Sequence, residues 1–314
     1  DMDALPVSEV NEVDYVSQNP GVMHACGHDA HMAMGLGVAT LMSRHRDDMK
    51  GTLKLIFQPA EEGIGGAKRM VEEGVLEDPS PDIFLSVHVF SDLPVGSIAA
   101  TPGPVMAAAD EWACTVRGKG GHGAMPQQTI DPIVISAQIV NALQTIVARN
   151  VPPLDTAVLS VGSIHGGTAL NIIPPQVEME GTVRTFSSEV QALVWRRMRE
   201  VIEGVAAAHG ASVDLRIKAG TPAVVNDGEV TKVTLAAAKE VVGPESVIPE
   251  HRTMGSEDAA YFMQDVPGCY FFVGSGNVER GLDAPHHNPR FDIDEDALPL
   301  GVATLMHTLA HYLL

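Results

Sequence analysis

The chain contains little cysteine and few basic residues. It has only three cysteines, Cys26, Cys114 and Cys269, which are too few for a disulfide scaffold and favour a reducing, cytoplasmic location. Lysine and arginine number 20 against 40 acidic residues, so the formal net charge is −20. Because phosphate groups are bound by clustered basic residues, this balance argues against nucleic acid or an anionic membrane surface as a partner.

Long apolar runs are also lacking. None approaches the ~20 residues that span a bilayer, and the chain does not open on the basic region and apolar core of a signal peptide. The composition, 45% hydrophobic and 19% charged, is that of a globular protein. A length of 314 residues predicts about two domains. The 13 histidines are compatible with a metal protein or simply with a soluble one, and composition does not choose between them.

The first third of the chain alternates helix and strand patterns. Asp29 is expected to cap a helix over residues 31–46, and residues 66–73 form a second, shorter helix. Strands are predicted over residues 52–57 and 83–90, the second of them buried. Strands that alternate with helices indicate a parallel or mixed sheet covered by helices.

A different order follows in the middle of the chain. Four strands and two helices are predicted in the order β-α-β-β-α-β, over residues 111–117, 131–148, 157–164, 177–186, 187–209 and 213–218. This is the ferredoxin-like split unit. Beyond Pro222 the helix and strand alternation returns, with a closing helix over 297–314. We therefore predict an α/β domain, residues 1–109 and 222–314, interrupted by an inserted α+β domain, residues 110–221.

The densest group of potential metal ligands lies in residues 23–31, which contain three histidines, one cysteine and one aspartate. Cys26 and His28 place a thiolate and an imidazole on one short turn, a combination that holds Zn²⁺ or a similar ion. The alternative is a loop at the start of a helix whose histidines are incidental. Spacing alone leaves both interpretations open.

A second group is the adjacent pair Glu61 and Glu62, at the C-terminal end of a predicted strand. One carboxylate can bind metal while the other acts as general base. A solvated pair at the start of a helix is the better interpretation when the pair is taken alone. His88 lies on the next predicted strand, and the paired histidines His286 and His287 lie in a loop bounded by prolines. Each is a candidate metal ligand. The alternative for His88 is a histidine of the protein core, and the alternative for the loop is an exposed loop without a ligand.

The predicted inserted domain adds three candidates. His122 lies in a glycine-rich stretch that lacks the Gly-Lys-Ser/Thr ending of a phosphate loop. Asn171 presents an amide between apolar neighbours, and Arg184 places on a strand a guanidinium suited to bidentate capture of a carboxylate. Each residue, considered separately, is more often structural than functional.

Together, and in this order, the motifs resemble the aminoacylase/carboxypeptidase G superfamily of metallo-amidohydrolases. Within it the chain is similar to the amidohydrolase branch of hippurate hydrolases, N-acyl-amino-acid amidohydrolases and plant auxin-conjugate hydrolases. The most specific features are the Cys-Gly-His-Asp turn and the Pro-Ala-Glu-Glu-Gly stretch. The matching stretches are residues 1–6, 24–29, 58–63, 86–88, 120–124, 169–174, 181–184 and 287–289.

The resemblance implies a role for each candidate. Cys26 matches the ligand that bridges two metal ions, which is an aspartate in most of the superfamily, and Glu61 matches the general base. The terminal metal ligands are matched by His28, Glu62, His88 and His287.

The other implied roles concern the substrate. His122 matches a residue that stabilises the oxyanion, often from a dimer partner. Asn171 and Arg184 match residues that hold the substrate's carbonyl and carboxylate groups.

The resemblance also implies an activity. It predicts metal-dependent hydrolysis of N-acyl amino acids with two divalent ions, Zn²⁺ or Mn²⁺, with Co²⁺ or Ni²⁺ also suited. It predicts a catalytic α/β domain and a homodimer formed through the inserted domain. The alternatives are a non-catalytic relative that binds metal or acyl amino acids, a dipeptidase or carboxypeptidase of the same superfamily, and a cysteine hydrolase using Cys26. Because relatives carry further strand and helix before the Asp-Met-Asp stretch, we expect the N-terminal part of the catalytic domain to be missing.

Overall fold

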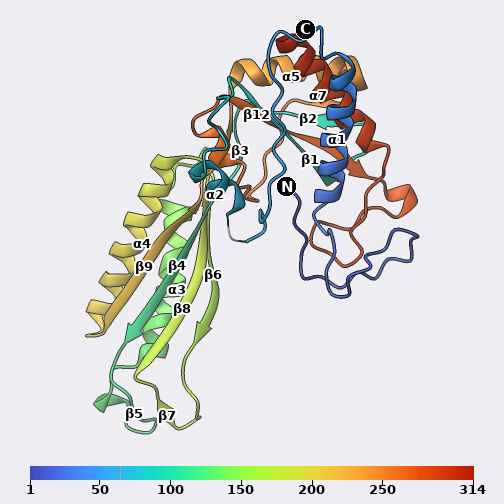
Figure 1. Cartoon of the computed structure of the whole chain (residues 1–314). Helices are drawn as coiled ribbons and strands as arrows, with labels where there is room; N and C mark the ends of the chain where they lie inside the picture. The colour runs from blue at the N-terminus through green and yellow to red at the C-terminus, as the bar shows by residue number, and fades with distance from the viewer. Residues whose placement is uncertain (64) are drawn as a thin grey trace. The chain divides into compact units, whose positions relative to one another are not determined.

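The computed structural model describes residues 1–63 and 65–314, and the chain divides into two compact units (Figure 1). Unit 1 comprises Asp1–Val105, Val224–Arg252 and Glu257–Leu314, and unit 2 comprises Met106–Ala223 and Thr253–Ser256. The sequence placed the inserted domain at residues 110–221. It gave no indication that the short segment Thr253–Ser256 belongs with unit 2.

Unit 1 is built on a four-stranded sheet. Its strands are β1 (Phe84–Pro94), β12 (Gly268–Gly276), β2 (Ile98–Ala99) and β11 (Val247–Ile248), in the order β1-β12-β2-β11. β1 and β12 are parallel, whereas β2 runs antiparallel to β12. All nine residues of β12 are buried, because helices and loops cover both faces of this central strand. The sheet is therefore mixed, as predicted.

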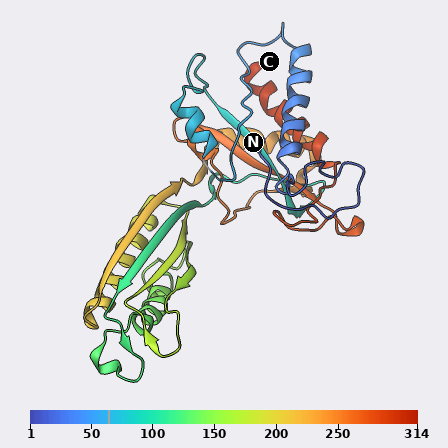
Figure 2. The same ribbon diagram turned by 60° about the horizontal axis from the view of Figure 1, so that its bottom comes forward.

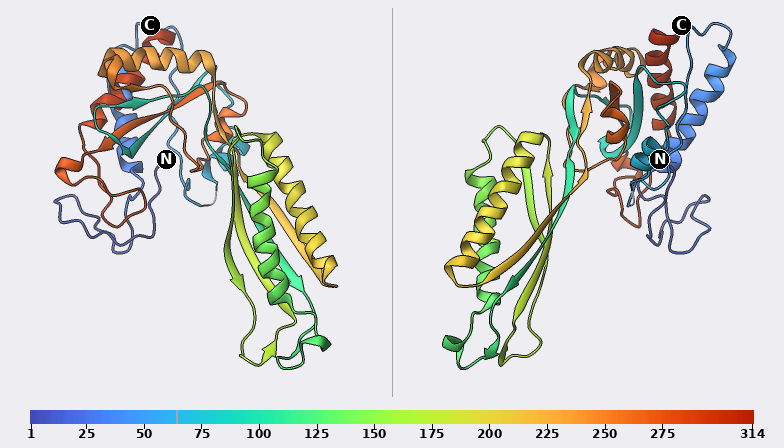
Figure 3. Two further views of the ribbon diagram at one scale, coloured as in Figure 1. Left: turned by 180° about the vertical axis from the view of Figure 1, so that it is seen from behind. Right: turned by 60° about the vertical axis from the view of Figure 1, so that its left-hand side comes forward.

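Three long helices pack on this sheet: α1 (His28–Arg44), α5 (Gly228–Val242) and α7 (Ala297–Leu313). α1 and α7 lie side by side (Figure 3), and small residues allow the close approach. A Cβ added at Gly301 would lie 2.1 Å from the sulfur of Met34. The shorter elements of unit 1 are α2 (Gly66–Glu72), α6 (Ala260–Met263), η2 (Pro244–Ser246), η3 (Val278–Arg280), and the paired strands β3 (Gly103–Met106) and β10 (Val224–Asn226).

The start of α1 differs from the prediction. The helix begins at His28, and its N-cap residue is Gly27, whose φ of 84° is left-handed and which makes no side-chain cap. Asp29, predicted as the cap, lies in the first helical turn. The physical reason is the close approach of β1, because a Cβ added at Gly27 would lie 2.5 Å from Cγ2 of Val89. The turn therefore has room for glycine and not for a capping side chain.

The predicted strand at residues 52–57 is wrong. This stretch forms no strand, and no strand among the described residues pairs with it. Alternating apolar residues are compatible with a strand, but a strand also needs a neighbour for its backbone hydrogen bonds. Here residues 52–58 line a cavity of about 590 Å³ together with residues of β1, α1 and α7. Lys54 holds the stretch by donating to the carbonyl oxygens of Val75, Glu77 and Pro79 at 2.8–2.9 Å.

Unit 2 has the predicted ferredoxin-like arrangement (Figure 2). β4 (Ala108–Arg117), β6 (Ala157–His165), β8 (Gln176–Thr185) and β9 (Ser212–Thr221) form an antiparallel sheet in the order β6-β8-β4-β9. α3 (Pro132–Arg149) and α4 (Ser188–Ala208) pack on it. The remaining elements are β5 (Gly121–His122), β7 (Ile172–Ile173) and η1 (Pro126–Gln128).

The helices of unit 2 begin where their capping residues predict. Oδ1 of Asp131 accepts from the backbone N–H of Ile133 at 2.9 Å at the start of α3. Oγ of Ser187 accepts from the N–H of Val190 at 3.2 Å at the start of α4. α3 is the one helix of the described chain that is long and apolar enough to be a candidate membrane span. It buries Ile135, Ile139, Leu143 and Ile146 in the core of unit 2, as amphipathic core helices do.

Candidate metal centre

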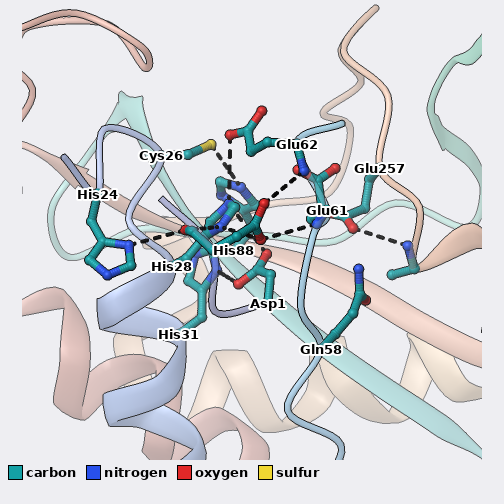
Figure 4. A network of polar contacts seen from close by, with 12 residues as sticks. Asp1, His24, Cys26, His28, His31, Gln58, Glu61, Glu62, His88 and Glu257 are labelled. Carbon is teal, nitrogen blue, oxygen red and sulfur yellow. Dashed lines mark hydrogen bonds and ion pairs between the residues drawn. The ribbon is translucent and has the colours of Figure 1, made fainter. Parts of the chain in front are cut away.

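Six of the nine predicted site residues lie together in unit 1. They come from the turn before α1, the first residue of α1, the turn before α2, the middle of β1 and the loop after η3. These residues are Cys26, His28, Glu61, Glu62, His88 and His287. Figure 4 shows Cys26, His28, Glu61, Glu62 and His88 among them.

Glu62 is the central carboxylate of the cluster. It forms one candidate ligand group with Cys26 and His287 and a second with His28 and Glu61, and the ligand atoms of each group lie within 4.8 Å of one another. Oε1 of Glu62 is 3.1 Å from Nε2 of His287 and 3.9 Å from Nε2 of His28. A carboxylate shared between two groups of this kind can contribute to two adjacent cation positions.

The backbone fixes which nitrogen each buried histidine presents. Nδ1 of His28 lies 3.0 Å from the carbonyl oxygen of Asp3, and Nδ1 of His88 contacts the carbonyl oxygen of Val89. A carbonyl can only accept, so each Nδ1 carries the hydrogen and each Nε2 offers a lone pair. Nε2 of His88 lies 3.6 Å from Sγ of Cys26. These are the tautomers that a metal site with Nε2 ligands requires.

Two buried atoms of the cluster have no hydrogen-bond partner among the described residues. They are Nε2 of His28 and Oε1 of Glu62. The 3.1 Å approach of His287 to Glu62 lacks the alignment of a hydrogen bond. Burying polar atoms without a partner is unfavourable, by about 1–3 kcal/mol each. A bound cation would satisfy both, so the donor set fits divalent metal.

The charges of the cluster lead to the same conclusion. Burial, then the nearby carboxylates of Glu257 and Glu62, raise the pKa of Glu61 to about 9. Burial and the carboxylates of Glu62 and Glu61 raise the pKa of the Cys26 thiol far above its usual range. Burial lowers the pKa of His28 to about 4, so its ring is neutral at pH 7. Crowded acids that resist ionisation together with neutral imidazoles are the environment that a cation stabilises.

Asp3 has a structural role at the site to which the sequence did not point. Its two carboxylate oxygens accept hydrogen bonds from the backbone N–H groups of Glu61 and Glu62, each at 3.0 Å. The same bonds act to lower the pKa of Asp3 against the opposing effect of burial. Asp3 therefore fixes the turn that carries both glutamates. The stretch containing it matched the family, but no local pattern gave its role.

Glu257 was also missed. It is buried, and its oxygens accept from the Tyr270 hydroxyl at 2.8 Å and from the Ala259 N–H at 3.0 Å. Glu257 and Asp258 form with Glu61 a further group whose carboxylate oxygens lie within 4.8 Å of one another. These two acids directly follow the Thr253–Ser256 segment, and nothing in their local pattern separates them from a solvated pair.

The three remaining predicted residues lie in unit 2. His122 on β5 and Asn171 just before β7 are close to each other, because Gly123 N–H donates to the Asn171 carbonyl at 2.8 Å and β5 pairs with β7. Arg184 lies at the other end of unit 2, near the C-terminus of β8, where it pairs with Ala109. Its Nη1 donates to Oγ of Ser256 at 3.0 Å.

A mixed α/β unit that gathers one thiol, three imidazoles and two carboxylates, together with a ferredoxin-like unit, defines a metal-dependent hydrolase of amide bonds. The sequence profile of Peptidase family M20/M25/M40 matches residues 1–311. The chain belongs to this family.

Characterised relatives agree with this assignment. The chain is 42% identical over 317 residues to Thermostable carboxypeptidase 2 of Saccharolobus solfataricus, covering 100% of this chain and 78% of the relative. It is 41% identical over 298 residues to N-acetylcysteine deacetylase of Bacillus subtilis, covering 95% of this chain and 76% of the relative. The crystal structure of the Bacillus subtilis YXEP protein, a dinuclear metal-binding peptidase from the M20 family, superposes with a TM-score of 0.83 at 35% identity, covering 99% of this chain and 79% of that one.

Proposed function

We propose that the protein hydrolyses N-acyl amino acids to a carboxylic acid and a free amino acid. The observation that carries the proposal is the meeting of Glu61 with five metal-ligand side chains from separate segments. The deacetylase relative, which acts on N-acetylcysteine by its name, supports the substrate class. The low cysteine content and three free cysteines support action in the cytoplasm.

In this proposal the centre would hold two divalent cations. The residues that would bind them are Cys26, His28, Glu62, His88 and His287. The mixture of sulfur, nitrogen and oxygen donors suits Zn²⁺ or Mn²⁺, with Co²⁺ or Ni²⁺ as further candidates. When bound, such ions lower the pKa of water and polarise an amide carbonyl.

Glu61 acts as the general base. Its carboxylate accepts a proton from the attacking water and returns it to the departing amine nitrogen. The two hydrogen bonds from the backbone of Glu61 and Glu62 to Asp3 hold this turn in place. Neighbouring residues of one turn point in different directions, which lets Glu62 bind metal while Glu61 faces the substrate.

Unit 2 supplies the substrate contacts in this proposal. Arg184 binds the substrate carboxylate and Asn171 its carbonyl oxygen. Nη1 of Arg184 donates to Oγ of Ser256 at 3.0 Å, and the other N–H groups of the guanidinium can pair with an anion. His122 is exposed and donates to the developing oxyanion from the partner of a homodimer, where such a donor is worth about 3–4 kcal/mol.

The Glu61→Gln variant tests the mechanism. It keeps the shape of the side chain but removes the base, so hydrolysis of N-acetyl amino acids should be lost while metal content stays near two ions per chain. The matched control is Glu72→Gln, at an exposed position of α2, which should behave as the wild type. Full activity of Glu61→Gln refutes the mechanism. Loss of metal together with activity would instead assign Glu61 as a ligand.

A carboxypeptidase or dipeptidase is the second candidate, because one relative is named as a carboxypeptidase. A panel of N-acetyl, benzoyl and indole-acetyl amino acids and dipeptides, assayed with several divalent metals, separates the two candidates. Faster turnover of dipeptides than of every acyl amino acid would favour the second. Turnover of neither class, with metal bound, would favour a non-catalytic binding protein.

The cysteine-hydrolase alternative is disfavoured by the surroundings of Cys26. A nucleophilic thiolate needs cationic neighbours, whereas burial and the carboxylates of Glu62 and Glu61 raise the pKa of this thiol. A chelator should abolish activity, and activity that persists in the metal-free protein would restore the alternative.

The dimer has its own test. Mixing His122→Ala and Glu61→Ala subunits should restore activity in heterodimers, because each heterodimer contains one site with both residues intact. Confirmed heterodimers without recovery would count against action of His122 across the dimer.

A further inference from the structure

Two adjacent histidines follow η3, and they have different environments. His287, a proposed metal ligand, has a half-exposed side chain whose Nε2 lies 3.1 Å from Glu62. His286 packs its ring against Phe90 and Phe291, with centroid distances of 5.3 and 4.8 Å.

The backbone fixes the tautomer of His286. The N–H of Ser91 donates to Nε2 of His286 at 3.2 Å. A backbone N–H cannot accept, so Nε2 must present its lone pair, and the ring hydrogen of the neutral imidazole is on Nδ1. This nitrogen lies 3.7 Å from Sγ of Cys26.

His88 contacts the same sulfur in the opposite sense. Its Nδ1 hydrogen is engaged by the carbonyl of Val89, so the Nε2 that faces Sγ has a lone pair. Of the two imidazoles beside Cys26, one can therefore bind a cation and the other cannot. His286 has one nitrogen accepting from Ser91 and the other carrying hydrogen, which excludes it as a ligand in this arrangement.

We infer that His286 is a positioning residue that donates a hydrogen bond from Nδ1 to Sγ of Cys26 and so holds the sulfur toward the metal centre. The inference rests on the proposed function, in which Cys26 would be a metal ligand. A hydrogen bond to a ligating thiolate restricts its rotation and offsets part of its negative charge. Such outer partners typically change metal affinity by about 10–100-fold.

Two amide variants separate this role from packing. In His286→Asn the side-chain NH₂ takes the place of Nδ1 and can still donate to Sγ. In His286→Gln the amide reaches the place of Nε2, where its oxygen can accept from Ser91 but no donor faces Cys26. The control for the aromatic surroundings is His251→Phe. His251 packs on Phe90 and Phe272 at 5.0 and 4.9 Å, whereas the imidazoles that contact Cys26 in the described part of the chain are those of His88 and His286.

The measurement is a Co²⁺ titration of the metal-depleted chain. Absorption from sulfur-to-cobalt charge transfer reports the Cys26–metal bond, and competition with a chelator gives the dissociation constant. We expect His286→Gln to bind Co²⁺ about 10–100-fold more weakly with a shifted charge-transfer band. His286→Asn should stay within a few-fold of the wild type, and His251→Phe should match it.

Equal affinities and bands for the Asn and Gln variants would overturn the inference and leave the proposed function intact. Absence of the charge-transfer band in the wild type itself would remove Cys26 from the ligand set and would overturn the inference together with that part of the proposed function.

Discussion

Gly27, between the proposed ligands Cys26 and His28, should be intolerant of any side chain. Its φ of 84° is a conformation that costs an L-residue about 1–2 kcal/mol. A Cβ there would also lie 2.5 Å from Cγ2 of Val89, on the buried strand β1. Such overpacking costs about 1–3 kcal/mol. Gly27→Ala should therefore lower the free energy of unfolding by about 2–5 kcal/mol.

The two contributions can be measured separately. Gly21 has a similar φ of 79° with no atom within 4 Å of an added Cβ. Gly21→Ala should therefore lower the free energy of unfolding only through the backbone conformation, by about 1–2 kcal/mol. In a Val89→Ala background, Gly27→Ala should cost about 1–3 kcal/mol less than it does in the wild type, because the clashing methyl group is gone.

The assay is urea unfolding of the metal-depleted chains, followed by circular dichroism, with Co²⁺ affinity measured on the same samples. Gly27→Ala should also weaken metal binding, because its two neighbours move with the backbone. Equal costs of Gly27→Ala in the two backgrounds, within about 0.5 kcal/mol, would refute the steric part of the reasoning. A cost no larger than that of Gly21→Ala would do the same.

Three further predictions follow from contacts and charges. Asp3→Ala should release metal more readily than Asp3→Asn in equilibrium dialysis, since Asn keeps one acceptor for the Glu61 and Glu62 N–H groups; equal retention would contradict the role of Asp3. The folded, metal-free chain keeps a proton on Glu61, whose pKa is raised to about 9 from 4.5, so this group's contribution to stability is lost as pH rises between these values. The unfolding free energy of metal-free Glu61→Gln, measured with urea, should decline less steeply from pH 5 to pH 8 than that of the metal-free wild type. Parallel curves for the two proteins would contradict the raised pKa of Glu61. Ser187→Ala should lower the unfolding free energy by about 1 kcal/mol through loss of the α4 cap, and an unchanged thermal midpoint would contradict it.

Unit 2 was predictable because its signals are local. Asp131 with Pro132 and Ser187 with Gly210 mark helix ends within a few residues, and alternating strands between them leave one simple topology. The succession of strands and helices in unit 2 therefore followed from local patterns, without knowledge of how the elements pack.

The failures in unit 1 are matters of tertiary context. Residues 52–57 have the composition of a strand, but pairing depends on a neighbour that the stretch does not have among the described residues. The capping role of Asp29 depended on a turn whose shape is set by Val89, far away in sequence. Local pattern cannot reveal contacts of this kind.

The residues of the metal centre also differ in whether the sequence alone reveals them. Its ligand candidates were visible as short motifs, because each group needs a particular residue type at a particular spacing. Asp3 and Glu257 were not, since each acts through a contact with a residue far along the chain. His286 was visible only as one of two paired histidines, and its contact with Cys26 was not. Supporting residues are recognised only once the segments have been brought together.

The segments that form the centre come from both ends of the sequence, and Cys26 and His286 are 260 residues apart. Ions bound there would therefore connect the N-terminal segment of unit 1 to its C-terminal segment. Ions that bind only the native arrangement would stabilise it by about 2.7 kcal/mol when their free concentration is 100 times the dissociation constant. The supply of metal would then set how much of this chain stays folded, as well as how much is active.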